Sequence, residues 1–411
     1  MIENDLAARG AEYLRKLSLE IPNRRTGSPG NRAATDFFAE RLVSAGFRVE
    51  TPWFECIDWT QQGASLQVGA ETFVAQVSPY SPGCLVNGSL VVISTLYELE
   101  SAQPAGHVLL LRGEIAKEQL MPKSFPFYNP EEHQKIIAAL ERRPPLTIIA
   151  ATTENPEMAG AVYPFPLLED GDFDIPSVFM AEAEGNHLAA HAGEEACVRI
   201  SAKRSPASGC NVVASKGDPA RRVVLFAHID AKDGTPGAID NAAGSVVLLL
   251  LAELLADYTG ELGVEIVAMN GEDYYSVPGE KLYLELNQDR FGEIVLGINI
   301  DGPGYIEGKS AYSLYNCPSE LDLAVRETLS TYPGLVEGEP WYQGDHGLFL
   351  LHQRPVLVIT SEQVLELERN IVHSVKDRPE IVDPSKLAEL ALALHDLIVL
   401  LDRTLEPGSI R

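Results

Sequence analysis

The chain has 411 residues, 45% of them hydrophobic and 22% charged, a composition typical of a globular protein too long for one ordinary core. Its formal net charge of −27 argues against nucleic acid as a partner, because nucleic-acid binding depends on Lys and Arg that neutralise phosphates. No stretch approaches the roughly 18 apolar residues that a membrane helix needs, so we expect no membrane partner.

The cysteines and the first residues indicate the compartment. The five cysteines are odd in number and lack the spacing of zinc knuckles, so we expect buried free thiols rather than a disulfide framework. Such thiols are typical of a reducing compartment. The stretch from Met1 to Leu17 has early acidic residues and no apolar core segment, so we expect no secretory signal. Together these observations predict a cytoplasmic location.

Along the chain, the pattern of apolar residues predicts two domains. Apolar residues recur at helical spacing in residues 3–20 and 31–45, which predicts two helices near the N-terminus. In residues 52–200 the pattern changes to short β-type runs separated by Gly, Pro and Ser. We therefore expect a β-rich inserted domain there, within a second domain made of residues 1–51 and 201–411.

The stretch from Arg222 to Gly244 combines the features of a binding site. An apolar run from Val223 to Ala227 predicts a strand buried on both faces, and it stops at His228. Asp230 follows, and a loop rich in glycine and proline then leads to Asp240, at the start of a small, aliphatic segment that predicts a helix. Ligands in open α/β sheets bind beyond the carboxyl ends of the strands, so this arrangement indicates a site.

Each of three later apolar strands also leads to residues that can bind a metal. These residues are the pair Glu272 and Asp273, then Asp301, and finally His373. Imidazole and carboxylate groups at one edge of a sheet suit zinc or a related divalent ion. Five candidate ligands are too many for one tetrahedral ion, but they fit two ions bridged by Asp240.

Each of these residues also has a purely structural explanation. His228 could be a buried structural histidine, and Asp240 could be a helix N-cap. Glu272 could belong to an exposed acidic turn, and Asp301 to an Asp-Gly turn. The clustering of histidines and acids favours a metal site. Asp230 is too close to His228 in sequence to be an independent ligand, so we expect it to accept the second ring N–H of that histidine.

Five short motifs occur in a fixed order in the second half of the chain. They are His228-x-Asp230, Gly237-Ala-Ile-Asp240-Asn241-Ala-Ala-Gly244, Asn270-Gly-Glu272-Asp273, Ile298-Asn-Ile-Asp301 and His373-Ser-x-x-Asp377. Their order and spacing resemble those of the M28 family of zinc peptidases. The segment Arg25-Thr-Gly-Ser-Pro-Gly30 resembles the opening segment of that family. No single motif is specific, but five in this order are.

The resemblance implies a fold and a set of roles. The fold would be α/β, with a mixed, mostly parallel sheet sandwiched by helices. Two zinc ions would share Asp240; His228 and Asp301 would hold one ion, and Asp273 and His373 the other. Glu272 would act as the general base. The resemblance also implies a cis peptide bond between Asp240 and the asparagine that follows it.

The chain departs from the family pattern at two positions. Asp273 stands where Glu is commoner, and Gly344 opens a Gly-Asp-His segment where Ser-Asp-His is usual. Neither change removes a ligand, although the shorter side chain of Asp273 could loosen one ion. The last imidazole has two candidates, His346 and His373, and the family pattern assigns the role to His373.

The resemblance implies a peptide substrate and a co-catalytic dizinc exopeptidase, in the first place an aminopeptidase that releases N-terminal residues. The alternatives are a carboxypeptidase of the same family, a glutaminyl cyclase-like acyltransferase with one zinc, and a receptor-like homologue without catalysis. The insertion before the metal motifs argues against the cyclase, and the retention of Glu272 with every candidate ligand argues against the receptor. The insertion resembles a protease-associated domain and would be a lid, or else a stabilising element without function. The sequence does not predict the oligomeric state.

Overall fold

The computed structural model describes residues 2–21, 23–118, 120–123, 125, 129–152, 173–274, 276–341 and 344–404. The chain forms two compact units. The larger unit comprises Met1–Glu55, Ser208–Asp273 and Val277–Arg411, and the smaller unit comprises Cys56–Ala207 and Tyr274–Ser276. The sequence prediction placed the two main boundaries at residues 52 and 200.

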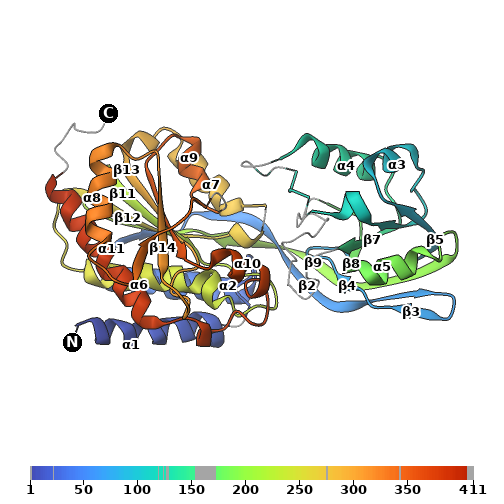
Figure 1. The fold of residues 1–411 in the computed structure, drawn as a ribbon, viewed down its shortest axis with the longest axis horizontal. Coiled ribbons are helices and arrows are strands. Elements are labelled where there is room, and N and C mark those ends of the chain that lie inside the picture. The colour runs from blue at the N-terminus through green and yellow to red at the C-terminus, as the bar shows by residue number, and fades with distance from the viewer. Residues whose placement is uncertain are drawn as a thin grey trace. The chain divides into compact units, whose positions relative to one another are not determined.

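The larger unit is built on a mixed sheet of eight strands in the order β1-β10-β12-β11-β13-β16-β14-β15 (Figure 1). The strands are β1 (Arg48–Glu50), β10 (Val212–Lys216), β11 (Asp218–His228), β12 (Leu262–Met269), β13 (Ile294–Ile300), β14 (Ser310–Tyr315), β15 (Leu335–Glu337) and β16 (Val356–Ser361). The four central strands, β12, β11, β13 and β16, are parallel to one another. Their carboxyl ends therefore lie along one edge of the sheet.

Helices cover both faces of this sheet, as expected when parallel strands alternate with helices (Figure 1). They are α1 (Ile2–Arg15), α2 (Pro29–Ser44), α6 (Ala243–Leu254), α7 (Pro278–Asn287), α8 (Ser319–Leu329), α9 (Gly347–Leu351), α10 (Val364–Asn370) and α11 (Pro384–Thr404). Along β11, Val223 and Leu225 face the core shared with α1, α6 and α11. Phe226 points to the other face and stacks on Phe349 of α9, with ring centroids 4.5 Å apart. Because side chains on both faces are buried, the run Val223–Ala227 is apolar at every position. The α/β fold predicted from the sequence is confirmed.

The smaller unit also contains an eight-stranded sheet, in the order β3-β2-β9-β5-β6-β7-β8-β4. The strands are β2 (Trp53–Val68), β3 (Glu71–Phe73), β4 (Gln76–Val77), β5 (Cys84–Ile93), β6 (Val108–Leu111), β7 (Thr147–Thr152), β8 (Ser177–Ala181) and β9 (Glu195–Cys210). Its described helices include α3 (Leu96–Ser101), α4 (Glu131–Arg142) and α5 (Glu182–Ala189). Strands β5 to β8 are parallel, so this β-rich unit has an α/β part that the sequence pattern did not predict.

Two further predictions can be compared with the described residues. None of the helices in these residues is long and apolar enough to cross a membrane. All five cysteines are free thiols, as predicted, but only Cys210 is fully buried. The expectation that all five are buried is therefore wrong, because the other four lie on partly exposed strands and loops.

Candidate metal centre

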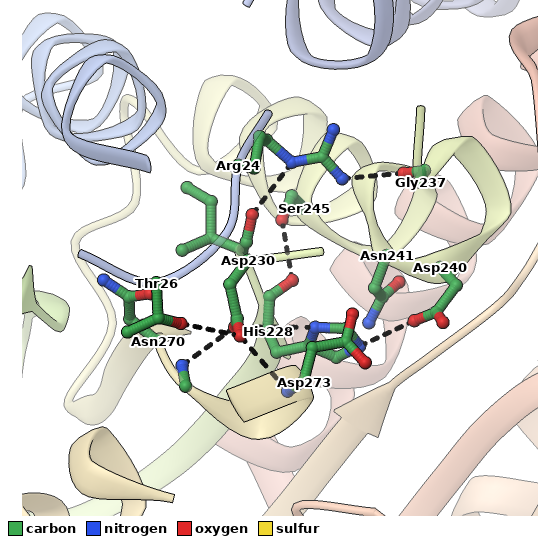
Figure 2. Close-up of polar contacts among 12 residues, drawn as sticks. Arg24, Thr26, His228, Asp230, Gly237, Asp240, Asn241, Ser245, Asn270 and Asp273 are labelled. Atoms are coloured by element: carbon green, nitrogen blue, oxygen red, sulfur yellow. Dashed lines mark hydrogen bonds and ion pairs between the residues drawn. The ribbon is translucent and has the colours of Figure 1, made fainter. Parts of the chain in front are cut away.

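The predicted site residues meet at the carboxyl edge of the central strands. His228 is the last residue of β11, and Asp301 directly follows the neighbouring strand β13. The Nε2 atom of His228 lies 3.0 Å from Asp240 Oδ1 (Figure 2). The same atom lies 3.6 Å from Asp301 Oδ1. Asp240 reaches this edge from a short helical turn, Ala238–Ala242, that leads into α6. Two strand ends and one helix start thus supply the first group of candidate ligands.

The second oxygen of Asp240 faces a second group. His373, in the loop after α10, places its Nε2 2.9 Å from Asp240 Oδ2 and 3.0 Å from Asp273 Oδ1. Asp273 lies in the turn that follows β12. Asp240 is therefore shared, with one carboxylate oxygen for each imidazole. The five residues predicted as ligands form two sets around it, one with His228 and Asp301 and one with His373 and Asp273.

Several atoms of these side chains are buried without a hydrogen-bond partner. They are both ring nitrogens of His228, both carboxylate oxygens of Asp273 and Nδ1 of His373. Burying polar atoms without partners is costly, so such atoms call for a ligand. Ligand atoms of His228, Asp240 and Asp273 lie within 4.8 Å of one another. The imidazole and carboxylate donors and their spacing fit a divalent ion of the zinc type.

The charges of the site also favour a bound cation. Burial alone would lower the pKa of the His228 imidazole, but the charge of Asp301 and the contact with Asp240 raise it well above its usual value. Burial is likewise outweighed at His373, where Asp273 and Asp240 raise the pKa to about 10. Without a metal, positive charge is thus drawn onto the imidazoles. A divalent cation would neutralise the same carboxylates.

Glu272, the predicted base, precedes Asp273 in the turn after β12. Burial raises the pKa of its carboxyl well above the usual value; His228 opposes this shift, and the charge of Asp273 adds to it. A carboxyl group with a raised pKa beside a metal-binding set is suited to take up a proton near neutral pH.

Asp230 has a role that the sequence did not predict, in addition to its predicted contact with His228. Its Oδ1 lies 3.7 Å from His228 Nδ1, which is too far for a hydrogen bond. Instead Oδ1 accepts from the backbone N–H of Gly271 at 2.8 Å, and Oδ2 accepts from the N–H of Asp273 at 3.1 Å and from the Thr26 hydroxyl at 2.9 Å (Figure 2). Asp230 therefore holds the turn that carries Asp273. Asp230 also lies within ion-pair distance of His228, and its orientation of the histidine stays a prediction.

Two residues that support the site were not predicted. Asp377 accepts hydrogen bonds from the backbone N–H groups of Ile239 at 2.6 Å and of Asp240 at 3.1 Å. It ended one of the five motifs, and that position was the only sequence signal for it. Arg24, which is 2% exposed, supports the other side of the same loop, and no sequence signal distinguished it from a solvated loop arginine.

Arg24 is bonded only to backbone carbonyl oxygens. Its Nη atoms donate to Gly237 at 2.7 Å (Figure 2), to Leu17 at 2.8 Å and to Pro236 at 2.9 Å. Its Nε donates to Ile229 at 2.9 Å. The guanidinium thereby joins the end of β11 to the loop that precedes Asp240.

The start of the next helix is shaped by a predicted feature. The peptide bond between Asp240 and Asn241 is cis. The Asn241 side chain donates to the carbonyl of Ile300 at 2.9 Å and accepts from the N–H of Gly244 at 2.9 Å. A Cβ at Gly244 would lie only 2.3 Å from the Ile300 oxygen, so this position requires glycine. Asn241 and Gly244 thus pack the start of α6 against the end of β13.

His346, the alternative to His373, lies elsewhere. Its Nδ1 is 3.4 Å from the Asn299 amide nitrogen, and its ring packs against Tyr315 and Trp341. Burial lowers the pKa of His346 to about 4. The structure brings His373, not His346, to Asp240.

The fold and this cluster define the class of the protein. It is an α/β protein with an imidazole–carboxylate metal centre at the carboxyl edge of a mixed sheet. Residues 211–398 match the family model of peptidase family M28. The match contains every predicted site residue.

Similarity to individual proteins agrees with the family. The chain is 23% identical over 301 residues to a probable leucine aminopeptidase 2 of Aspergillus oryzae (strain ATCC 42149 / RIB 40), which covers 71% of this chain and 58% of that protein. It therefore spans less than two thirds of this curated relative. A second relative, a probable leucine aminopeptidase 2 of Aspergillus fumigatus, is 24% identical over 304 residues.

Solved structures show the same fold. An aminopeptidase from Aneurinibacillus sp. strain AM-1 has a TM-score of 0.76 at 18% identity, covering 100% of this chain and 97% of that chain. A zinc aminopeptidase from Bacillus subtilis has a TM-score of 0.75 at 17% identity, covering 96% of this chain and 95% of that chain. A glutaminyl cyclase from Porphyromonas gingivalis has a TM-score of 0.51 at 14% identity, covering 96% of this chain and 98% of that chain.

Proposed function

We propose that the chain is a metallo-aminopeptidase that uses two divalent ions, zinc in the first place, to hydrolyse the peptide bond after an N-terminal residue. One observation carries this proposal. Asp240 presents one oxygen to His228 and the other to His373, so the residues fall into two ligand sets around a shared carboxylate. The aminopeptidase names of the relatives support the substrate class and the end of the peptide that is attacked.

In this proposal His228 and Asp301 would hold one ion, Asp273 and His373 would hold the other, and Asp240 would be a ligand that the two sets share. Bound there, divalent ions would supply Lewis acidity, which lowers the pKa of water so that it can lose a proton near neutral pH and become a stronger nucleophile. Glu272 accepts the proton that the attacking water loses and passes it to the nitrogen of the leaving group, so the peptide bond breaks to an acid and an amine.

The other residues position these groups. Asp230 holds the backbone of the turn that carries Glu272 and Asp273. Asp377 and Arg24 hold the loop that carries Asp240. Misplacing a ligand or a base by an ångström is costly to the rate, which gives these buried contacts a role in catalysis without contact to the substrate.

The decisive experiment separates the base from the ligands. Glu272→Gln keeps the size of the side chain but removes its ability to accept a proton. We expect kcat to fall about 10²–10⁴-fold, the usual contribution of a general base, with metal content unchanged. Asp273→Asn should instead reduce metal occupancy together with activity. Glu253→Gln is the control, because Glu253 contacts Arg9 and Tyr13 and lies outside the site. Full activity of Glu272→Gln would contradict the assignment of the base.

A substrate panel tests the reaction class. Aminoacyl and peptide substrates, assayed with zinc, cobalt and manganese, should show release of the N-terminal residue. Release of the C-terminal residue would support the carboxypeptidase, and cyclisation of an N-terminal glutamine with one ion per chain would support the cyclase. Metal binding without turnover would support the receptor-like homologue. Three expectations from the sequence stay predictions. They are the cytoplasmic location, the resemblance of the smaller unit to a protease-associated domain, and the action of this unit as a lid.

A further inference from the structure

A second group of potential metal ligands lies in the smaller unit. His187 Nε2 is 3.0 Å from Glu71 Oε1, and His191 Nε2 is 3.1 Å from Glu71 Oε2. His187 is in α5, and His191 lies in the turn that follows this helix, with the two imidazole ring centroids 6.0 Å apart. Glu71 comes from β3, more than a hundred residues earlier in the chain. One ligand atom from each of the three residues lies within 4.8 Å of the others.

The surroundings hold these side chains in place. Phe73, two residues after Glu71 on β3, is 3% exposed, and its ring centroid lies 5.2 Å from that of His187 and 5.6 Å from that of His191. Both imidazoles therefore rest on one buried aromatic ring. Glu184 of α5 accepts a hydrogen bond from the N–H of Val74 at 2.8 Å, which ties the helix to the end of β3. The cluster is thus held by contacts that do not involve an ion.

His191 has a further partner that is typical of a metal ligand. Its other ring nitrogen, Nδ1, lies 3.3 Å from Glu194 Oε1. Histidines that bind metals usually donate this second N–H to a carboxylate or carbonyl, which fixes the tautomer and leaves the lone pair of Nε2 for the ion. With neutral imidazoles, the two carboxylates of Glu71 and Glu194 balance the charge of one divalent cation.

We propose that Glu71, His187 and His191 form a binding site for one divalent transition-metal ion, of the zinc type, on the surface of the smaller unit. Two imidazoles select against calcium and magnesium, which prefer oxygen ligands, and in favour of zinc and its neighbours. Three protein ligands leave a fourth position for water. The side chains of Glu71, His187 and His191 are 41%, 53% and 22% exposed, so an ion can enter from solvent. The bound ion cross-links β3 to α5.

Titration of the full-length chain tests the site. The Asp240→Ala chain lacks the ligand that the two sets of the larger unit share. When this chain is stripped of metal and titrated with zinc, we expect calorimetry to show one bound zinc ion per chain. Adding His187→Ala should remove that ion, and Glu194→Gln should weaken it about 10–100-fold, the usual effect of losing such a partner. His395→Ala is the matched control, because His395 is a partly exposed histidine beside the single acid Asp396 and should change nothing.

Two readouts keep the proposal falsifiable. Cobalt bound in place of zinc should give visible absorption bands of a four-coordinate ion with nitrogen ligands, and these bands should disappear in the His187→Ala chain. Titrating otherwise wild-type chains with and without His187→Ala should show a difference of one ion, whatever the larger unit binds. Equal zinc stoichiometry in the two chains would overturn the site. If the three residues form only an ion-paired cluster, the chains with and without His187→Ala will bind the same number of zinc ions.

Discussion

Replacing Arg24 by methionine tests whether a buried guanidinium shapes the metal-binding loop. Arg24 donates four hydrogen bonds to backbone carbonyls, two of them in the loop before Asp240. Methionine keeps much of the apolar stem but donates none, so four carbonyl oxygens lose a charged donor. Hydrogen bonds to charged groups contribute about 1.5–3 kcal/mol each, but they are not additive. Leaving a buried acceptor without a donor costs about 1–3 kcal/mol, so for four carbonyl oxygens we expect a total loss of unfolding free energy of roughly 3–5 kcal/mol.

A second buried arginine provides the control. Arg222 is 1% exposed, and its guanidinium contacts Glu265, Glu293 and Asn287. It lies in the same strand as His228 but six residues earlier, about 20 Å away at the rise of a β-strand. Arg222→Met should destabilise the larger unit by a similar amount without changing the shape of the metal centre.

The assay measures stability and zinc affinity on the same preparations. Urea unfolding of metal-stripped protein gives the loss of free energy, and competition with a chromophoric chelator in the absence of urea gives the affinity. We expect Arg24→Met to weaken zinc binding at least tenfold, equivalent to about 1.4 kcal/mol, and Arg222→Met to leave it within about twofold. If Arg24→Met binds zinc like the wild type although it is less stable, the loop keeps its shape without Arg24 and the reasoning is refuted.

Two further substitutions test local features of the larger unit. Gly244→Ala should cost about 1–3 kcal/mol, because its Cβ would lie 2.3 Å from the Ile300 oxygen, whereas Gly292→Ala, with open space at Cβ, should cost far less; thermal unfolding would measure both. Burial raises the pKa of Glu280 from 4.5 to about 7, so the folded state binds a proton that the unfolded state has released. The stability of metal-stripped protein should therefore fall by up to about 3 kcal/mol as pH rises from 4.5 through 7, and Glu280→Gln should flatten this fall in urea titrations at several pH values. Equal slopes for the two chains would show that Glu280 is not the group responsible.

The central strands could be predicted because they are apolar on both faces. The apolar strand expected before Asp301 is β13, and the run that ends at His228 forms the end of β11. Once parallel strands are inferred, their carboxyl ends must meet, which brings His228 and Asp301 together without any knowledge of loops. His373 required the family resemblance, because a loop histidine has no periodicity to place it.

The supporting contacts could not be predicted from the residues alone. Asp230 was expected at His228, but its carboxylate also accepts hydrogen bonds from backbone N–H groups in a turn that begins 41 residues later, and nothing in the sequence indicated these. Arg24 binds carbonyl oxygens, which every residue carries, so nothing in the sequence marks its partners. Such contacts depend on the path of the loops, which local patterns do not specify. The parallel strands of the smaller unit were missed for a related reason, since short β-type runs do not reveal their pairing.

The insertion of the smaller unit has a consequence for the order in which the protein forms during synthesis. Strand β1 is synthesised before this unit but pairs with β10, which is synthesised after it. Helix α1 packs against α11, the last described helix in the sequence. The smaller unit is continuous in sequence apart from Tyr274–Ser276. Domains generally fold as units as they leave the ribosome. We therefore expect the smaller unit to fold before the segments of the larger unit that pack against α1 and α2 have been synthesised. The part of the larger unit that is translated first is thus among the last to reach its final packing.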